Sequence, residues 1–370
     1  MVIKSLMLKN FRNYSGLHID FAKEFNIIYG DNAQGKTNII EAIFLCASGR
    51  SHRTSKDGEL LKNGTSNFGI TLILKREGVE KEIDISYTIE ERKKIKINEI
   101  PAKRMGDLMG HLNAVMFSPE DLLLIKQGPA ERRRFADITL SQLKPSYFYD
   151  LQQYAKILYQ RNSLLKNLPL KKDLEDTLDV WDRHLIKTGT RIMKERSRFI
   201  SKLNVLAKNR HNKLTNNEEN LTLIYDPSFE YADGSDDSEI EKSFKRVLEK
   251  NRAREILKGN TMVGPHRDDM DIVLNGESTK IYGSQGQQRT SVLSMKLAEI
   301  DIMKEESGEY PVLLLDDVLS ELDDKRKEYL IESIENVQTF ITCTDRRFFQ
   351  KNIENTSFFY IDSGTVENKN

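Results

Sequence analysis

A glycine-rich turn between an apolar strand and an apolar helix constrains this chain more than any other feature. Residues 25–47 read FNIIYGDNAQGKTNIIEAIFLCA, in which Gly30, four residues and then Gly-Lys-Thr form the pattern of a phosphate-binding loop. The glycines let the backbone wrap a phosphate chain, and the N–H groups that open the following helix supply positive potential. The sequence therefore predicts a nucleotide site at residues 30–38.

The residues of this loop have different expected roles. Lys36 places a point charge near the outer phosphates of ATP, and Thr37 is the expected Mg²⁺ ligand. The other expected contacts to the nucleotide are Gly30, Asp31, Asn32, Ala33, Gln34, Gly35 and Asn38. The alternative is a strand-to-helix turn with an incidental lysine, and the apolar segments on both sides argue against it.

A second stretch supplies acidic residues to the same kind of site. Residues 310–315 form an apolar run that ends in Asp316 and Asp317, as expected of a buried strand that delivers carboxylates to the edge of an α/β sheet. We expect Asp316 to hold Mg²⁺ through water and Asp317 to orient or deprotonate the attacking water. With Lys36, they are the predicted catalytic residues.

Bulk properties limit the class of protein. The 370 residues include 57 basic and 57 acidic side chains, so any surface that binds nucleic acid must come from local segregation of charge. Cys46 and Cys343 are the only cysteines and lie in apolar runs, which argues against a disulfide scaffold or a zinc site. The N-terminus lacks a signal-type apolar core and no segment approaches ~20 apolar residues, so we expect a cytoplasmic protein without a membrane partner.

Periodicity predicts an α/β protein interrupted by helices. Alternating or apolar runs indicate strands at 2–8, 17–21, 25–29, three stretches between 69 and 100, 115–117, 270–274 and 280–282. Helical spacing, with a start at Ser118 and Pro119, indicates helices at 130–206 and 240–257. We therefore expect a head formed by 1–117 and 261–370, with a mainly helical lobe inserted at 118–260.

Several cations near these elements have two possible roles. Arg53, in the polar turn after the helix of the phosphate loop, either reaches a γ-phosphate or is a solvated loop cation. The candidate DNA contacts are Lys93, Lys94, Arg132, Arg133 and Arg134. The lysines lie on a predicted strand and either meet a phosphate backbone or protect a sheet edge, which we favour. The arginines form a dense basic run, and such a run is usually the solvated face of a helix.

Residues 284–288, SQGQQ, open another helix and form a second candidate anion site. A serine and a glycine at a helix N-terminus can bind an anion, although an N-cap in a glutamine-rich loop is the simpler reading in isolation. The candidate contacts are Ser284, Gly286 and Gln287. Residues 320–323, SELD, follow the two acids directly and start a further helix.

In this order, these motifs resemble the head domain of ABC-type ATPases. The helical insert after Phe117 and the LKNFRNY segment at 8–14 resemble the SMC-type branch of that family. Residues 117–121, 131–135, 264–269 and 283–290 are similar to segments of the bacterial recombination mediators within this branch. The resemblance implies a P-loop ATPase head in which a mixed sheet with helices is joined to an antiparallel β subdomain.

The resemblance also implies a composite site. Ser284 of one subunit would contact the γ-phosphate held by the loop of a second subunit, so ATP would join two heads in a homodimer and ADP would release them. Arg53 stands where such heads place an arginine near the phosphates. Asp317 replaces the more usual glutamate, and only Thr344 and Asp345 stand near the position of the usual switch histidine, so hydrolysis is expected to be slow.

The implied biology is ATP-gated binding of double-stranded DNA near junctions with single-strand gaps, with weak DNA-stimulated ATPase activity. The implied partners are RecR, often RecO, and indirectly RecA, which replaces single-strand-binding protein during repair, replication restart and SOS induction. Two rivals stay open, namely the ATPase subunit of a membrane transporter and an ATP-gated interaction scaffold that does not bind DNA.

Overall fold

The computed structural model describes residues 1–169, 175–232, 234–345 and 356–368. The chain forms two compact units: unit 1 comprises Met1–Leu122 and Arg289–Asn370, and unit 2 comprises Leu123–Gln288. The sequence prediction assigned residues 261–288 to the head. In the structure they belong to unit 2, because strand β10 within them pairs with a strand of the insert.

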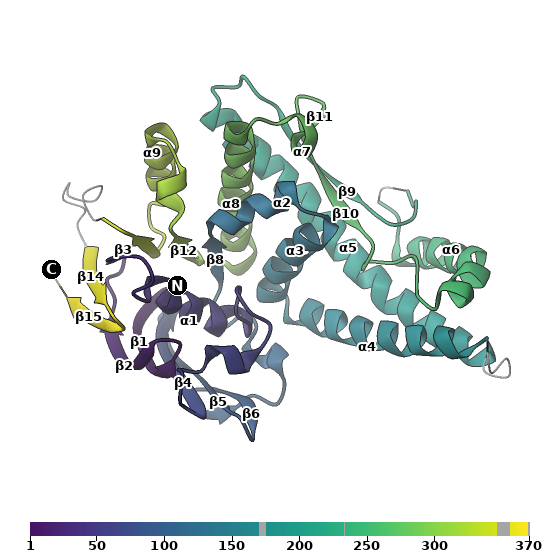
Figure 1. Cartoon of the computed structure of the whole chain (residues 1–370). Coiled ribbons are helices and arrows are strands. Elements are labelled where there is room, and N and C mark those ends of the chain that lie inside the picture. The colour runs from purple at the N-terminus through teal and green to yellow at the C-terminus, as the bar shows by residue number, and fades with distance from the viewer. Residues whose placement is uncertain (170–174, 233, 346–355, 369–370) are drawn as a thin grey trace. The chain divides into compact units, whose positions relative to one another are not determined.

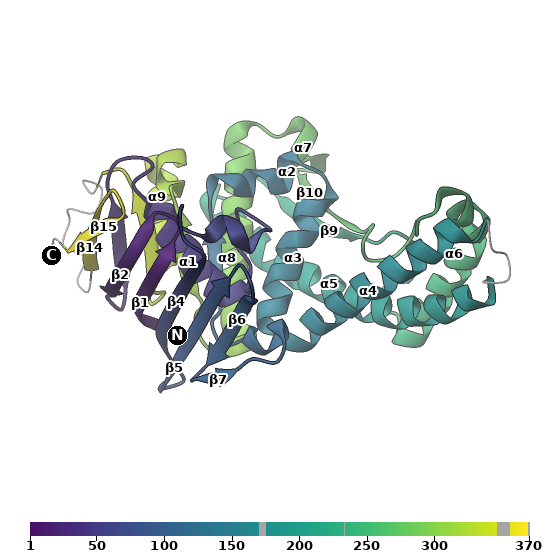
Figure 2. The ribbon, with the colours of Figure 1, turned by 60° about the horizontal axis from the view of Figure 1, so that its bottom comes forward.

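Unit 1 contains an antiparallel sheet in the order β2-β1-β4-β5-β6-β7 (Figure 2). Its strands are β1 (Val2–Phe11), β2 (Tyr14–Asp20), β4 (Asn67–Arg76), β5 (Val79–Thr88), β6 (Arg92–Ile97) and β7 (Ile100–Pro101). Side chains of β4 and β5 alternate between buried and more exposed positions, which is the pattern of a sheet with one packed face. The predicted strands at the N-terminus and between 69 and 100 are thus confirmed.

The second sheet of unit 1 has the order β15-β14-β3-β13-β12-β8. Its strands are β3 (Phe25–Tyr29), β8 (Ala114–Phe117), β12 (Val312–Asp316), β13 (Thr339–Cys343), β14 (Thr356–Asp362) and β15 (Thr365–Asn368). All neighbours except β14 and β15 are parallel, and β3, β8 and β12 are buried along their full length. The carboxyl ends of β3 and β12 therefore share one edge of the sheet, with β13 between them.

Helix α1 (Lys36–Ser48) follows β3 and contacts strands of both sheets (Figures 1 and 2). Its apolar residues are buried almost without interruption from Ile39 to Ala47, because both faces of the helix are covered. The remaining helical elements of unit 1 are η1 (Asp57–Leu60), η2 (Met105–Leu108), η3 (Pro119–Leu122), η5 (Val318–Glu321) and α9 (Asp324–Ser333). Helix α8 (Gln285–Ser307) begins in unit 2 and continues into unit 1.

Unit 2 is mainly helical, with a small sheet in the order β11-β10-β9 (Figure 1). Its helices are α2 (Leu123–Lys126), α3 (Pro129–Leu143), α4 (Pro145–Asn167), α5 (Glu175–Leu214), α6 (Asp237–Lys258) and α7 (Thr279–Tyr282). Its strands are β9 (Leu221–Asp226), β10 (Asp269–Leu274) and β11 (Glu277–Ser278). Within the described segments, no helix combines the length and apolar character needed to cross a membrane.

Two local predictions in unit 2 need correction. Residues 280–282, predicted as a strand, lie in the short helix α7, because β11 ends after two residues and Thr279 O accepts a bond from the N–H of Gly283 at 3.1 Å. Strand β9 was not predicted. Its signal is the alternation of buried Leu221 and Leu223, which is short and lies beside a polar turn.

The GPHRDD segment at 264–269 takes part in a network of buried hydrogen bonds and ion pairs within unit 2. Arg196, which is 4% exposed, donates to Pro265 O at 2.5 Å and to both carboxylate oxygens of Asp137 at 2.9 Å. The buried Asp268 accepts bonds from the Tyr225 hydroxyl and from the N–H of Ser228. These buried charges are paired and hydrogen-bonded, as their desolvation requires.

Candidate nucleotide-binding site

The phosphate loop has a backbone that only glycine adopts without strain. Gly30 and Gly35 have φ values of 147° and 118°. A Cβ on Gly30 would lie 2.3 Å from Ile361 O, and one on Gly35 would lie 2.5 Å from Asn13 Nδ2. Both glycines are therefore required by conformation and by close packing.

The side chain of Lys36 is enclosed by the loop that precedes it. Its Nζ donates to Gly30 O at 2.7 Å and to Asp31 O at 2.8 Å. Burial lowers the pKa of Lys36, and the negative charge of Asp317 acts in the opposite direction. Asp31, Asn32 and Ala33 are exposed, so the outer part of the loop is accessible to a ligand.

The loop and the strand-end acids meet in unit 1. Thr37 Oγ1 donates to Asp316 Oδ1 at 2.9 Å, and Thr342 Oγ1 donates to the same oxygen at 2.7 Å. Burial raises the pKa of Asp316, while these two bonds oppose the rise. The next residue, Asp317, has φ 54° and an exposed side chain, and its N–H donates to Thr342 Oγ1 at 2.9 Å. The hydroxyl of Thr37 and the carboxylate of Asp316 are hard oxygen donors, so the pair fits Mg²⁺.

The β1–β2 hairpin supports the loop from outside. Asn13 Nδ2 donates to Gln34 O at 2.7 Å, and Asn13 Oδ1 accepts from Asn38 Nδ2 at 2.8 Å. The Tyr14 hydroxyl donates to Gly35 O at 3.1 Å. This hairpin segment carries part of the family resemblance, but its role in supporting the loop was not predicted.

Glu41 is a fully buried carboxylate one turn into α1. Arg12 donates to it twice, from Nε to Oε2 at 2.8 Å and from Nη2 to Oε1 at 2.6 Å, and Ser51 Oγ donates to Oε1. Burial opposes its ionisation, but the bonds from Arg12 and Ser51 prevail and lower the pKa of Glu41. Sequence reasoning missed this residue, although a single acid within the apolar run 39–47 is an available signal.

The turn between β14 and β15 also contacts the loop. The N–H of Ser363 donates to Gln34 Oε1 at 2.7 Å, and the N–H of Gly364 donates to Gln34 O at 3.2 Å. No local sequence pattern predicts this contact, because the partners are far apart in the chain.

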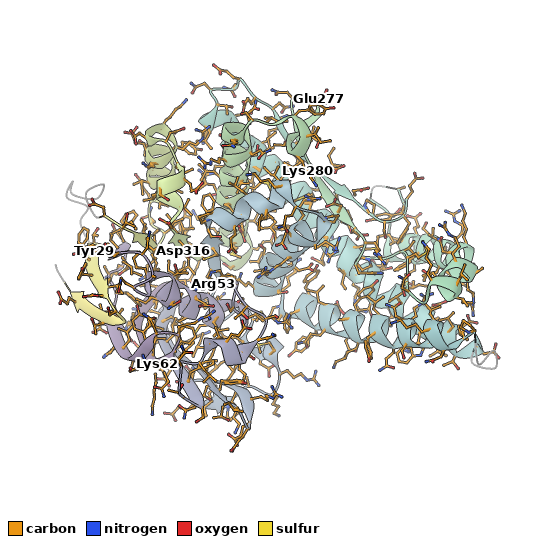
Figure 3. The ribbon with its side chains drawn as sticks, in the orientation of Figure 1. Tyr29, Arg53, Lys62, Glu277, Lys280 and Asp316 are labelled. Atoms are coloured by element: carbon orange, nitrogen blue, oxygen red, sulfur yellow. The ribbon has the colours of Figure 1, made fainter. Side chains whose placement is uncertain are left out.

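Arg53 lies against the first turn of α1 (Figure 3). Its Nη1 donates to Asn38 Oδ1 at 3.2 Å and lies 3.7 Å from Glu41 Oε2. The side chain is 43% exposed, so its guanidinium is both anchored and accessible beside the phosphate loop. Its contact with a phosphate stays a prediction.

The predicted second anion site lies in unit 2, whereas the phosphate loop lies in unit 1. Ser284 and Gln287 form a capping box at the start of α8: Ser284 Oγ accepts from the N–H of Gln287 at 3.2 Å, and Gln287 Oε1 accepts from the N–H of Ser284 at 2.9 Å. Gln287 Nε2 also donates to Glu219 Oε1 at 2.9 Å. Ser284 is exposed and Gly286 is half-buried.

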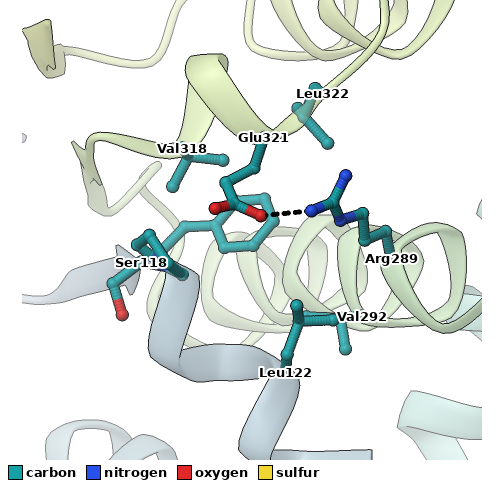
Figure 4. Close-up of a pocket in the computed structure, with 9 residues that line it drawn as sticks. Ser118, Leu122, Arg289, Val292, Val318, Glu321 and Leu322 are labelled. Atoms are coloured by element: carbon teal, nitrogen blue, oxygen red, sulfur yellow. Dashed lines mark hydrogen bonds and ion pairs between the residues drawn. The ribbon is translucent and has the colours of Figure 1, made fainter. Parts of the chain in front are cut away.

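An ion pair joins α8 to the segment after the acids, within unit 1. Arg289 Nη2 donates to Glu321 Oε2 at 2.5 Å beside a small pocket (Figure 4). The pocket is lined by Phe117, Ser118, Pro119, Leu122, Arg289, Val292, Val318, Glu321 and Leu322. Ser320 Oγ donates to Asp317 O at 2.7 Å. Because Ser320 precedes Glu321, this bond and the Arg289–Glu321 ion pair together connect Asp317 with α8.

Several predicted DNA contacts have charged groups held by the protein. Lys93 is 10% exposed and donates to Asp57 Oδ1 at 2.7 Å, and Lys94 pairs with Glu91. Arg132 is also 10% exposed and pairs with Asp269 at 2.6 Å. Arg133 donates to a backbone carbonyl, Asp268 O, at 2.6 Å, and the exposed Arg134 lies 3.9 Å from Glu131. We therefore leave Lys93 and Arg132 out of the proposed DNA contacts.

Comparisons with known proteins agree with this geometry. The sequence model of the family described as "RecF/RecN/SMC N terminal domain" matches residues 2–367. A protein of Ruminiclostridium cellulolyticum named "DNA replication and repair protein RecF" is 54% identical over 368 residues, which cover 99% of each chain. A protein of the same name from Acetivibrio thermocellus is 56% identical over 365 residues, which cover 98% of this chain and 99% of the relative.

Solved structures give the same result. The structure described as "the recombination mediator protein RecF-ATP in RecFOR pathway" has a TM-score of 0.93 and 39% identity, and the match covers 100% of this chain and 98% of the other. An SMC head bound to a winged-helix domain of ScpA has a TM-score of 0.58 and 17% identity, with coverage of 100% and 97%, which shows the shared fold. The predicted fold class, an ABC-type head with an antiparallel β subdomain and a helical insert, is therefore confirmed. The chain belongs to the RecF family, within the RecF/RecN/SMC group of ATPase heads.

Proposed function

We propose that this protein is an ATP-gated DNA-binding protein of recombinational repair. The observation that carries the proposal is the bond of 2.9 Å between Thr37 and Asp316, which joins the phosphate loop to the acidic strand end. Family membership supports ATP as the nucleotide, since a RecF structure was solved with ATP. The names of the relatives refer to DNA replication and repair.

The residues of unit 1 divide the proposed chemistry among them. The Nζ of Lys36 would exchange its bonds to the carbonyls of Gly30 and Asp31 for bonds to the outer phosphates. Thr37 would bind Mg²⁺ directly, and Asp316 would bind it through water. Mg²⁺ held by these two residues would supply positive charge that neutralises the phosphates. Asp317 would orient the attacking water. Its side chain is one methylene shorter than glutamate, which supports slow hydrolysis that acts as a timer.

Gating would come from a composite site. Ser284, Gly286 and Gln287 would close over the nucleotide held by a second subunit, so ATP would stabilise a homodimer. The capping box supports this role, because it fixes the exposed Ser284 at the helix N-terminus, where an anion is stabilised. Arg53 would contact the phosphates within the same subunit.

The proposed site of action is cytoplasmic double-stranded DNA near single-strand gaps. DNA would stimulate the weak ATPase, and hydrolysis would release the protein. RecR, often together with RecO, is the proposed partner, because a homologous RecF structure is assigned to the RecFOR pathway. RecA would be loaded indirectly in DNA repair, replication restart and SOS induction.

The test is a titration of the protein into a fluorescent gapped duplex with Mg²⁺, followed by anisotropy in ATP and separately in ADP. We expect tight binding in ATP that weakens with salt and collapses in ADP. Equal binding in both nucleotides would contradict ATP gating. Absence of binding in both would favour the interaction scaffold, and co-fractionation with membranes would favour the transporter subunit.

Lys36→Arg tests the catalytic assignment in the same system. Arginine keeps the positive charge but is larger and planar, so it does not fit the enclosure formed by Gly30 O and Asp31 O. We expect loss of DNA-dependent ATP turnover. Turnover that persists in this variant would remove Lys36 from the catalytic residues.

A further inference from the structure

Thr342 is a buried residue near the carboxyl end of β13, next to the two acids of the proposed site. It is 1% exposed, and in the register of the parallel sheet it stands directly opposite Asp316 of β12. We propose that Thr342 is a positioning residue for ATP hydrolysis, whose hydroxyl holds both Asp316 and Asp317 in place. The inference rests on the proposed function, because it adds a residue to the same site.

The single hydroxyl group of Thr342 connects the two acids. Its Oγ1 donates to Asp316 Oδ1 at 2.7 Å and accepts the N–H of Asp317 at 2.9 Å. A backbone N–H only donates, so the bond from Asp317 leaves the one proton of the hydroxyl available for the carboxylate. The two bonds are therefore compatible with each other, and the direction of each is fixed.

The bond to Asp316 restrains the orientation of its carboxylate. Thr37 Oγ1, from the first turn of α1, donates to the same oxygen at 2.9 Å, so hydroxyls from two different elements meet at Oδ1. Thr37 is itself proposed to bind Mg²⁺. A second donor from the neighbouring strand orients Asp316 without relying on that residue, as outer groups around metal sites do.

The bond from Asp317 restrains its backbone. The pairing of β12 with β13 ends at Asp316 and Thr342, and the next residue, Asp317, has φ 54°. Such a conformation is uncommon for a residue with a side chain and persists where surrounding contacts hold it. Thr342 holds the N–H of Asp317, and Ser320 Oγ donates to the carbonyl of Asp317 at 2.7 Å. Hydroxyl groups therefore hold the backbone on both sides of the proposed water-orienting carboxylate.

A second threonine of the same strand has a hydroxyl with a different kind of partner. Thr339 is fully buried, and its Oγ1 donates to a backbone carbonyl, Val337 O, at 3.0 Å. It lies at the amino end of β13, opposite Leu313 of β12. Thr339 and Thr342 thus share residue type, strand and burial, and they differ in whether the hydroxyl reaches the acids.

The test removes the hydroxyl of Thr342 in two ways. Thr342→Val keeps the branched shape of threonine, and Thr342→Ala is compared with Thr342→Ser, which keeps the hydroxyl and lacks only the methyl group. The matched control is Thr339→Val.

Three measurements are made on each variant of the full chain. Phosphate release with Mg²⁺ and duplex DNA gives kcat and the KM for ATP. Mn²⁺ then replaces Mg²⁺ in the presence of an ATP analogue that is not hydrolysed, and electron paramagnetic resonance of the free ion gives the affinity for the metal. Thermal melting compares the stability of the variants.

We expect Thr342→Val and Thr342→Ala to lower kcat about 10–100-fold and to bind Mn²⁺ more weakly than the wild type. The KM for ATP should change little, because the contacts of the phosphate loop remain. Thr342→Ser should keep most of the wild-type rate, and Thr339→Val should keep both kcat and Mn²⁺ affinity whatever stability it loses. Equal losses of kcat in the two valine variants, or a serine variant as slow as the alanine variant, would overturn the inference.

The outcomes also separate this inference from the proposed function. If the wild-type protein hydrolyses no ATP, the proposed function fails, and the Mn²⁺ affinities of the same variants still test the role of Thr342. If only Thr342→Val fails to fold, the comparison of serine with alanine decides. If both variants without the hydroxyl fail to fold while Thr342→Ser folds, the hydroxyl is structural and the inference is overturned.

Discussion

Removing the charge of Glu41 is the sharpest test of how the phosphate loop is supported. In Glu41→Gln the side chain keeps its shape but loses its negative charge, and its NH₂ group faces a guanidinium nitrogen of Arg12. Glu41 is fully buried and Arg12 is 20% exposed, so water replaces the lost interaction poorly. The variant therefore leaves a largely buried positive charge without its partner.

The expected loss in the free energy of unfolding follows from these contacts. Breaking a buried ion pair costs about 3–5 kcal/mol, and we discount it to about 2–4 kcal/mol because the guanidinium is partly exposed. For a unit of about 150–250 residues, 1 kcal/mol corresponds to about 2–4 °C in melting temperature, so we expect a decrease of about 4–16 °C. Circular dichroism with heating measures the change.

The same variant should bind ATP less tightly, because Arg12 precedes Asn13, which holds the carbonyl of Gln34. Titration with a fluorescent ATP analogue measures this effect. The control is Glu80→Gln, which breaks the exposed pair of Glu80 with Lys4 and should cost at most about 1 kcal/mol. A melting temperature within about 1 °C of the wild type for Glu41→Gln, or equal decreases in both variants, would refute the reasoning.

The pH dependence of this difference has a definite sign. The folded protein holds the pKa of Glu41 below its ordinary value of 4.5. A carboxylate with a lowered pKa contributes stability above the unfolded pKa and loses it as the pH falls through the folded value. The advantage of the wild type over Glu41→Gln should therefore be complete above pH 4.5 and shrink below it.

Three other outcomes are expected. Thr37→Val and Asp316→Asn should each abolish Mg²⁺-dependent ATP hydrolysis while unfolding remains cooperative, as measured by phosphate release and thermal melting. Burial lowers the pKa of His266 from 6.5 to about 4, so the wild type should lose up to about 3 kcal/mol of stability between pH 6.5 and 4, and His266→Gln should lose less over this range in denaturant titrations. Arg289→Glu and Glu321→Arg should each slow ATP turnover, and the double variant should recover part of it if their ion pair couples α8 to the acids.

The core of the site was predictable because its signals are local. The glycine pattern fixes a backbone conformation, and apolar runs fix two strands whose carboxyl ends meet at one edge of a parallel sheet. Thr37 and Asp316 are separated by 279 positions, yet two short motifs and this topology are enough to bring them together. This contact can be predicted without knowing the conformation of the surrounding loops.

The support of the loop was not predictable in the same way. Gln34 contacts Ser363 and Gly364, and Glu41 contacts Arg12, through the way the β14–β15 turn and the β1–β2 hairpin pack. Hydrogen bonds of this kind depend on side-chain positions across the fold, and no spacing in the sequence encodes them. A lone acid in an apolar helix indicates that a buried partner exists, without identifying it.

The cations show most clearly what the sequence alone does not predict. Residues that are adjacent in the sequence of a helix point in different directions, whereas residues three or four apart share a face. Consecutive residues point about 100° apart. Arg132 is therefore buried against Asp269, Arg133 is half-buried, and Arg134 is exposed, so this dense basic run does not form one charged face.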